Sequence, residues 1–242
     1  MNVDTCRDDA DVARVAAGRF IEIGNDAIHS NGSFTVALAG GSTPRALYAL
    51  LASNDYEGRV DWSRVLVFWG DERCVPLDHK NSNFKMAWDT LLSRIAIPSE
   101  NVHRMPTELG PDAAACAYAA VLKKAFELPS GAFPSLDLIL LGMGADGHTA
   151  SLFPHTAAIN ETRRLVVAHF VDRLDTHRLT LTPPVLTGAA NVLFLVTGEN
   201  KAQALKRVLK DPYRPSEFPA QLLRHATGAV TWIIDYAAAG KL

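Results

Sequence analysis

The sequence is poor in features that stabilise secreted domains, bind structural zinc or cross a membrane. Its 242 residues include three cysteines, Cys6, Cys74 and Cys116, and none of them belongs to a CxxC pair. An odd number of widely spaced cysteines predicts neither a disulfide framework nor a cysteine zinc site. No apolar segment is long enough to span a bilayer, and the N-terminal segment lacks the apolar core of a signal peptide. We therefore expect a soluble, cytoplasmic protein with no membrane partner.

A strong net charge is also missing. The formal net charge is −2, from 24 Lys and Arg against 26 Asp and Glu. This balance gives no reason to expect a nucleic-acid groove or an anionic membrane surface as a partner. The hydrophobic fraction of 48% excludes a mainly disordered chain.

Helix and strand patterns alternate along the chain. Apolar residues recur at steps of three and four from about Asp8 to Ser30, which predicts an amphipathic helix. The alternation, with no repeat and no long linker, predicts a single three-layer αβα domain over residues 1–242 with a mainly parallel sheet. The predicted strands are Phe34–Ala39, which comes first, then Val65–Trp69, Leu136–Leu141, Leu165–Val171, Arg178–Leu181, Asn191–Val196 and Ala229–Ile234.

The turn after the first predicted strand lacks the nucleotide-binding motifs. Gly40-Gly41-Ser42-Thr43 has neither the spacing and lysine of a Walker A loop nor a GxGxxG pattern, which disfavours ATP and NAD. Its backbone N–H groups, two hydroxyls and following helix favour a phosphate or another small anion. The alternative is a tight turn in which Ser42 or Thr43 caps the helix. Ser42 is a poor nucleophile candidate, because Pro44 stands where a nucleophile elbow needs its second glycine.

The most informative stretch is Leu136–Pro154, LDLILLGMGADGHTASLFP. Its apolar first half predicts a central strand, and three glycines then break the pattern where the strand ends. Asp146 and His148 lie in this turn, at the strand end where ligands of open α/β sheets collect, so they are candidates for acid/base chemistry. The alternative is that Asp146 caps a following helix and His148 is a polar loop residue. His148 and His155 lack the spacing and companion ligands of a zinc site, so we predict no required metal.

Other charged residues are expected near the strand ends. Asp71, Glu72 and Arg73 follow an apolar strand and form either a solvated loop or part of a crevice. In a crevice, Arg73 would stabilise negative charge on an oxygen, and Asp71 would position a polar substrate or an arginine. Arg178 and Lys201 also fall near strand ends and supply positive charge.

Five segments resemble the 6-phosphogluconolactonase family of the pentose phosphate pathway and keep the family's order. They are LAGGSTPRALYALL (Leu38–Leu51), WGDERCVP with SNFKMA downstream (Trp69–Pro76, Ser82–Ala87), DLILLGMGADGHTASLFP (Asp137–Pro154), RLTLTPPVL (Arg178–Leu186) and TGENKAQAL (Thr197–Leu205). The resemblance implies a sugar-phosphate isomerase-like α/β fold, a modified Rossmann fold. It also implies hydrolysis of 6-phospho-D-glucono-1,5-lactone to 6-phosphogluconate without a cofactor.

The resemblance also implies a role for each motif residue. His148 would be the general base that activates water, Asp146 would orient it, and Arg73 would stabilise charge on the lactone oxygen. The loop Gly41-Ser42-Thr43, Arg178 and Lys201 would hold the phosphate. The family usually has prolines just upstream of Arg178, whereas this chain reads DRLDTH, so the phosphate arginine could instead be Arg173. The sequence leaves open whether Glu72 contacts substrate or only holds Arg73, and whether the protein is a monomer or a homodimer.

Two other functions are alternatives for this sequence. The related glucosamine-6-phosphate deaminase/isomerase group is similar in its GGSTP and DGH motifs, but its proton transfer uses a carboxylate shortly after the histidine, and Thr149–Pro154 contains none. A non-catalytic sugar-phosphate sensor would need a DNA-binding helix pair. Only one helix is predicted before Phe34, and no basic patch accompanies it.

Overall fold

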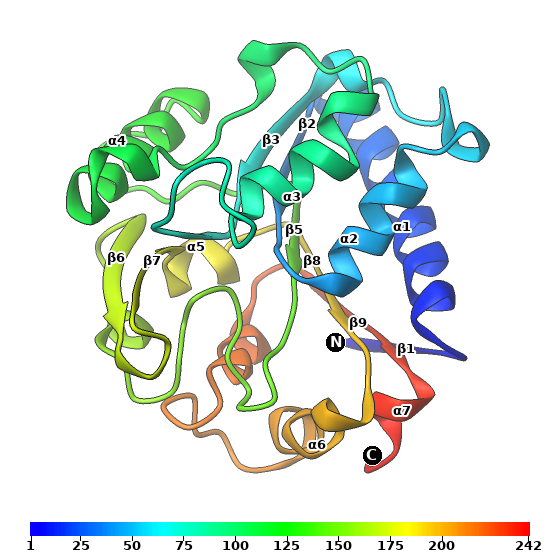
Figure 1. Ribbon diagram of the computed structural model, residues 1–242, viewed down its shortest axis with the longest axis vertical. Helices are drawn as coiled ribbons and strands as arrows, with labels where there is room; N and C mark the ends of the chain where they lie inside the picture. The colour runs from blue at the N-terminus through cyan, green and yellow to red at the C-terminus, as the bar shows by residue number, and fades with distance from the viewer.

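The computed structural model describes residues 1–242 and contains a six-stranded parallel sheet (Figure 1). Its strand order is β1-β9-β8-β5-β2-β3, and every neighbouring pair is parallel. The mainly parallel sheet predicted from the alternating pattern is confirmed. Its strands are β1 (Asn2–Cys6), β2 (Phe34–Leu38), β3 (Val65–Trp69), β5 (Leu138–Leu141), β8 (Asn191–Val196) and β9 (Ala229–Asp235).

One of these strands was missed. The first strand of the sheet is β1 and not the segment at Phe34, so the prediction that the sheet starts at Phe34 is wrong. The strand β1 pairs only with β9 at the sheet edge, and of its five residues only Cys6 is buried. A half-exposed edge strand with polar residues lacks the apolar run by which a buried strand is recognised.

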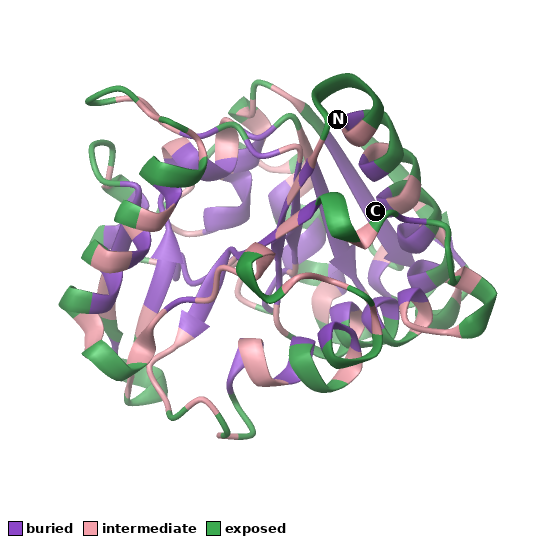
Figure 2. Cartoon of the chain, turned by 90° about the horizontal axis from the view of Figure 1, so that it is seen from above, coloured by how far each residue is buried: buried purple, intermediate pink, exposed green.

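Helices cover one face of the sheet. The helix α1 (Asp9–Asn31) begins where the Asp8 carboxylate accepts a hydrogen bond from the Asp11 N–H and ends at Gly32, whose φ is 80°. It packs across the strands together with α2 (Ser42–Leu51), and its inward stripe is buried while its outer side is exposed (Figure 2). The other helices are α3 (Asn83–Thr90), α4 (Pro111–Ala125), α5 (Pro183–Thr187), α6 (Ala202–Lys210) and α7 (Tyr236–Ala239).

A second, three-stranded sheet lies beside the first. It consists of β4 (Asp71–Arg73), β7 (Thr176–Leu181) and β6 (Val166–Val171), and both pairs are antiparallel. The sequence predicts the last two as strands but not their separate sheet. The link between them is a single 3₁₀ turn, Asp172–Leu174, with Asp175 in the left-handed region at φ 46°. Such a short link makes a hairpin, because parallel neighbours need a much longer crossover. The helix α4 covers this sheet (Figure 1).

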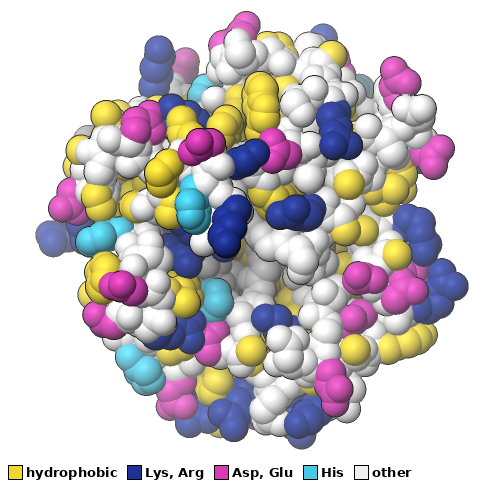
Figure 3. Space-filling view, viewed as in Figure 1, with side chains coloured by type: hydrophobic (Ala, Val, Ile, Leu, Met, Phe, Trp, Pro, Cys, Tyr) yellow, Lys and Arg dark blue, Asp and Glu magenta, His cyan; other side chains and the backbone are white.

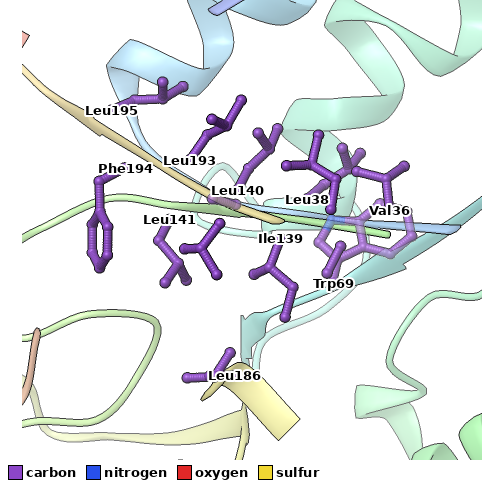
Figure 4. Packing of buried hydrophobic residues seen from close by; sticks show 14 of the residues in the cluster. Val36, Leu38, Trp69, Ile139, Leu140, Leu141, Leu186, Leu193, Phe194 and Leu195 are labelled. Carbon is purple, nitrogen blue, oxygen red and sulfur yellow. The ribbon is translucent and has the colours of Figure 1, made fainter. Parts of the chain in front are cut away.

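The core is continuous across the molecule. Leu140 and Leu193 point to the α2 side of the parallel sheet, whereas Ile139 and Leu141 point toward Leu186 of α5 (Figure 4). This alternation is what strands buried on both faces require. One hydrophobic cluster holds 61 buried residues, which favours the expectation of a single domain over residues 1–242. No helix has both the length and the apolar character needed to cross a membrane.

Candidate active site

A cavity of about 230 Å³ opens at the carboxyl ends of β2, β3, β5 and β8. These strands are parallel neighbours, so the segments that follow them meet at one edge of the sheet. Figure 3 shows this face hollowed near its centre, with Lys and Arg side chains around the hollow. The predicted site residues that line the cavity are Gly40, Gly41, Ser42, Thr43, Asp71, Arg73, His148 and Lys201.

The turn after β5 brings Asp146 and His148 into direct contact. The Gly144 N–H donates to the His148 carbonyl at 2.9 Å, and Gly147 has a φ of 79°, which favours glycine. An oxygen of the Asp146 carboxylate lies 2.5 Å from His148 Nδ1 and also accepts the His148 backbone N–H. No helix follows this turn, so the alternative in which Asp146 caps a helix is wrong.

This contact fixes the chemistry of the imidazole. Burial raises the pKa of Asp146, but the hydrogen bond and charge of His148 and the charge of Arg173 outweigh it, so the pKa lies below its ordinary value. An ionised carboxylate at Nδ1 favours the tautomer that carries its proton there. His148 Nε2 has no hydrogen-bond partner within the protein, and the side chain lines the cavity. His148 can therefore accept a proton from a molecule bound in the cavity.

Gly144 is required for this geometry. A methyl group at Gly144 would overlap both the His148 imidazole and the Asp146 carboxylate. We expect Gly144→Ala to lower kcat/KM by about tenfold to a hundredfold, since a small displacement of a catalytic group has a large effect. The measurement is the steady-state rate of the reaction that the resemblance implies, with a thermal melt to verify folding. Gly18→Ala is the control, because its added methyl meets nothing within 4 Å, and equal rates for both variants would contradict the prediction.

The glycine-rich loop and Lys201 belong to the same cavity. Gly41 has a φ of 110° and leads into α2, so the N–H groups at the start of that helix border the cavity. Thr43 Oγ1 lies 2.9 Å from Thr197 Oγ1, which ties the loop to the segment that carries Lys201. Lys201 forms no ion pair with any acidic side chain. A bound anion would be its natural partner.

The segment Asp71-Glu72-Arg73 is not a solvated loop. It forms β4, in which Asp71 and Glu72 are 7% and 3% exposed. Asp71 accepts a hydrogen bond from the Ser151 hydroxyl at 2.6 Å and another from the Asn83 amide at 3.2 Å. Arg73 lines the cavity, donates from Nη1 to the Asn81 carbonyl at 2.7 Å, and keeps a buried Nε with no partner.

Glu72 does not line the cavity. Its carboxylate accepts backbone N–H bonds from Arg73, Asn83 and Phe84, each at 2.7 Å. Burial raises the pKa of Glu72, and these three hydrogen bonds oppose the rise. Glu72 therefore holds the backbone of Arg73 and the first turn of α3 in place.

The two candidate phosphate arginines lie outside the cavity lining. Arg178 pairs with Arg73 across β4 and β7, and burial together with the charge of Arg73 lowers its pKa. Arg173 instead forms an ion pair with Asp146. The structure thus brings Arg73 and Lys201 to the cavity, and neither Arg173 nor Arg178 is among its lining residues.

Sequence reasoning missed two organising residues, Asn83 and Ser151. The Asn83 side chain occupies the space that a side chain at Gly40 would need, and it binds Asp71. Ser151 is fully buried and binds Asp71 through its hydroxyl. Both lie within segments that carry the family resemblance, but nothing in their local pattern marks them as partners of Asp71, which is 12 positions from Asn83 and 80 from Ser151.

Fold and site together define an α/β protein with an Asp–His pair and a glycine-rich loop at one crevice. The chain belongs to the family described as glucosamine-6-phosphate isomerases/6-phosphogluconolactonase, whose model matches residues 7–232. It is 41% identical over 217 residues to a 6-phosphogluconolactonase of Nostoc sp., covering 89% of this chain and 88% of that relative.

Solved structures agree with this family. The 6-phosphogluconolactonase from Trypanosoma cruzi superposes with a TM-score of 0.89 at 30% identity, over 100% of this chain and 96% of that one. A monomeric glucosamine-6-phosphate deaminase superposes with a TM-score of 0.83 at 21% identity, over the whole of both chains. The second match shows the fold alone, so the sugar-phosphate isomerase-like fold is confirmed without deciding between the two activities.

Proposed function

We propose that this chain hydrolyses 6-phospho-D-glucono-1,5-lactone to 6-phospho-D-gluconate, a step of the oxidative pentose phosphate pathway, without a cofactor. The observation that carries the proposal is the contact between Asp146 and His148 Nδ1, which leaves His148 Nε2 without a partner in the protein. His148 lines the same cavity as Arg73, Lys201 and the glycine-rich loop. Relatives that cover most of the chain carry the name 6-phosphogluconolactonase.

In the proposed mechanism, His148 Nε2 removes a proton from water as the water oxygen attacks the lactone carbonyl carbon. Negative charge develops on the carbonyl oxygen, where the Arg73 guanidinium stabilises it. The bond between this carbon and the ring oxygen then breaks, and the ring oxygen takes the proton from protonated His148. The product carboxylic acid finally releases a proton to solvent. Asp146 stabilises the imidazolium while it exists.

The phosphate is assigned to the glycine-rich loop and Lys201. The N–H groups and hydroxyls of Gly40–Thr43 and the ammonium group of Lys201 supply hydrogen bonds and positive charge to it. Asp71 has its carboxylate occupied by Ser151 and Asn83, so we assign it a positioning role at the cavity wall. Arg178 remains a proposed phosphate ligand that would have to reach the substrate from beside Arg73.

An isomerase or deaminase function has less support. Asp71 is the one acidic side chain that lines the cavity, and no carboxylate follows His148 within Thr149–Pro154. In that group a carboxylate shortly after the histidine transfers the proton, and this chain offers no free carboxylate for that role. The nearly neutral charge of the chain supports the further proposal that it does not bind nucleic acid. A cytoplasmic location and a monomeric or homodimeric state are proposed from the family resemblance.

The decisive experiment is a direct assay. The lactone is generated enzymatically, and its opening is compared with and without this protein, since the lactone also opens spontaneously. We expect the protein to accelerate lactone opening clearly. A rate equal to the spontaneous rate would refute the proposed function. Glucosamine-6-phosphate is tested in parallel, and its conversion in place of lactone opening would favour the isomerase group.

Lys201 provides a separate test of the phosphate site. We expect Lys201→Ala to raise KM about tenfold to a hundredfold with kcat changed little, because the phosphate contact is the same in ground state and transition state. The control is Lys206→Ala, because Lys206 is exposed on α6. A large loss of kcat at unchanged KM would contradict the assignment.

A further inference from the structure

Arg173 contacts the acid/base pair from outside the cavity. It lies in the 3₁₀ turn Asp172–Leu174 at the tip of the β6–β7 hairpin. Its guanidinium forms an ion pair with Asp146 Oδ2, while the other oxygen of that carboxylate is bound to His148 Nδ1. One carboxylate therefore connects a permanent cation to the imidazole that acts as the base.

The Arg173 guanidinium is also linked to His148 through the Phe153 ring. Its central carbon lies 4.8 Å from the centroid of the Phe153 ring, in cation–π contact. The Phe153 ring is 3% exposed and packs on the His148 imidazole, with centroids 4.3 Å apart and an interplanar angle of 33°. His148, Asp146, Arg173 and Phe153 thus form a closed ring of four contacts.

We propose that Arg173 is a positioning residue, which holds the Asp146 carboxylate and the Phe153 ring against His148 and lowers the proton affinity of that imidazole. The kinetic part of this inference rests on the proposed function, whereas the effect on His148 titration does not. Arg173 acts through Asp146 and Phe153 and need not touch the substrate.

The electrostatic reason lies in the shared carboxylate. A carboxylate next to an imidazole stabilises the protonated ring and so makes it a poorer proton acceptor at moderately acidic pH. A guanidinium on the second carboxylate oxygen offsets part of that charge and also repels the imidazolium. The Arg173 side chain is 50% exposed, so solvent screening keeps the effect moderate.

The remaining charged groups around His148 are unchanged by a substitution at Arg173. They come from different elements and are the same in the wild type and in the variants. They are Asp71 and Arg73 on β4, His169 on β6, Arg178 on β7 and Lys201 in the turn before α6. A difference between variants therefore reports Arg173 itself.

This role replaces the possibility that Arg173 binds the substrate phosphate. Arg173 does not line the cavity, whereas Lys201 does, and the Arg173 guanidinium is already engaged by Asp146 and Phe153. A phosphate ligand and a positioning residue leave different kinetic signatures. Loss of a phosphate contact raises KM equally at all pH values, while loss of the offsetting charge moves the acid limb of the pH profile.

The test compares Arg173→Met, Arg173→Lys and Arg163→Met. Arg163 is exposed and forms no ion pair, so Arg163→Met makes the same change in net charge away from His148. The His148 ring is titrated by ¹H–¹⁵N NMR, and kcat/KM is measured from pH 5 to 9. Thermal melts verify that each variant is folded.

For Arg173→Met we expect the His148 titration midpoint and the acid limb of kcat/KM to move to higher pH by about half a pH unit. Relative to wild type, the activity at pH 6 then falls about threefold more than at pH 8.5. Arg173→Lys should restore most of the wild-type profile. An unmoved NMR midpoint, or an equal shift in Arg163→Met, would overturn the inference, as would a KM increase that is uniform in pH. If neither the wild type nor any variant hydrolyses the lactone, the proposed function fails. The NMR titration of His148 then decides the role of Arg173 by itself.

Discussion

Replacing His148 by alanine is expected to lower kcat for lactone opening by about three orders of magnitude. The imidazole is the one group in the cavity whose free nitrogen can take a proton from water while a fixed carboxylate holds its other nitrogen. Alanine removes the base, but Arg73, Lys201 and the glycine-rich loop remain. Binding of the product 6-phosphogluconate should therefore change only a few-fold, and calorimetric titration can measure this separately from the rate.

The controls separate chemistry from folding. His29 lies exposed on α1, so His29→Ala should retain wild-type kcat and KM. A thermal melt within a few degrees of wild type would establish that His148→Ala is folded. If the folded His148→Ala protein kept more than a tenth of the wild-type kcat, His148 would not be the base, although the lactonase activity itself would stand.

Part of this site could be predicted from the sequence because its signals are local. The run Leu138–Leu141 followed by Gly142, Gly144 and Gly147 identifies a buried strand and the turn at its end without knowledge of the fold. Parallel strands then place the Gly40–Thr43 loop and Lys201 at the same sheet edge. The cavity lining follows from these two steps, and the structure agrees for both.

The rest depends on contacts between distant segments. Asn83 and Ser151 meet at Asp71, although they are separated by more than sixty positions in the chain. The separate small sheet depends on a hairpin whose turn at Asp175 requires a positive φ without glycine, so the usual turn signal is missing. The ion pair between Arg173 and Asp146 follows from that hairpin, which explains why the sequence suggested only a phosphate contact for Arg173.

Replacing Glu72 by alanine is expected to lower the free energy of unfolding by about 3–9 kcal/mol. Three backbone N–H groups, of Arg73, Asn83 and Phe84, donate to this buried carboxylate, and alanine leaves all three without an acceptor. Each buried donor left unpaired costs about 1–3 kcal/mol, and the missing side chain adds a cavity. This loss is large compared with the roughly 5–15 kcal/mol that stabilises a typical domain. Urea unfolding followed by tryptophan fluorescence measures it.

Two further variants test why Glu72 is needed. Glu72→Gln keeps one acceptor oxygen but turns an NH₂ group toward backbone donors, so its loss of stability should fall between those of wild type and Glu72→Ala. Glu57→Ala removes an exposed glutamate and should change the stability by less than about 0.5 kcal/mol. Because Glu72 holds the first turn of α3, its loss also releases Asn83 from Asp71 and Arg73 from its position in β4. A Glu72→Ala protein with wild-type stability and a raised KM would instead mean that Glu72 contacts the substrate directly.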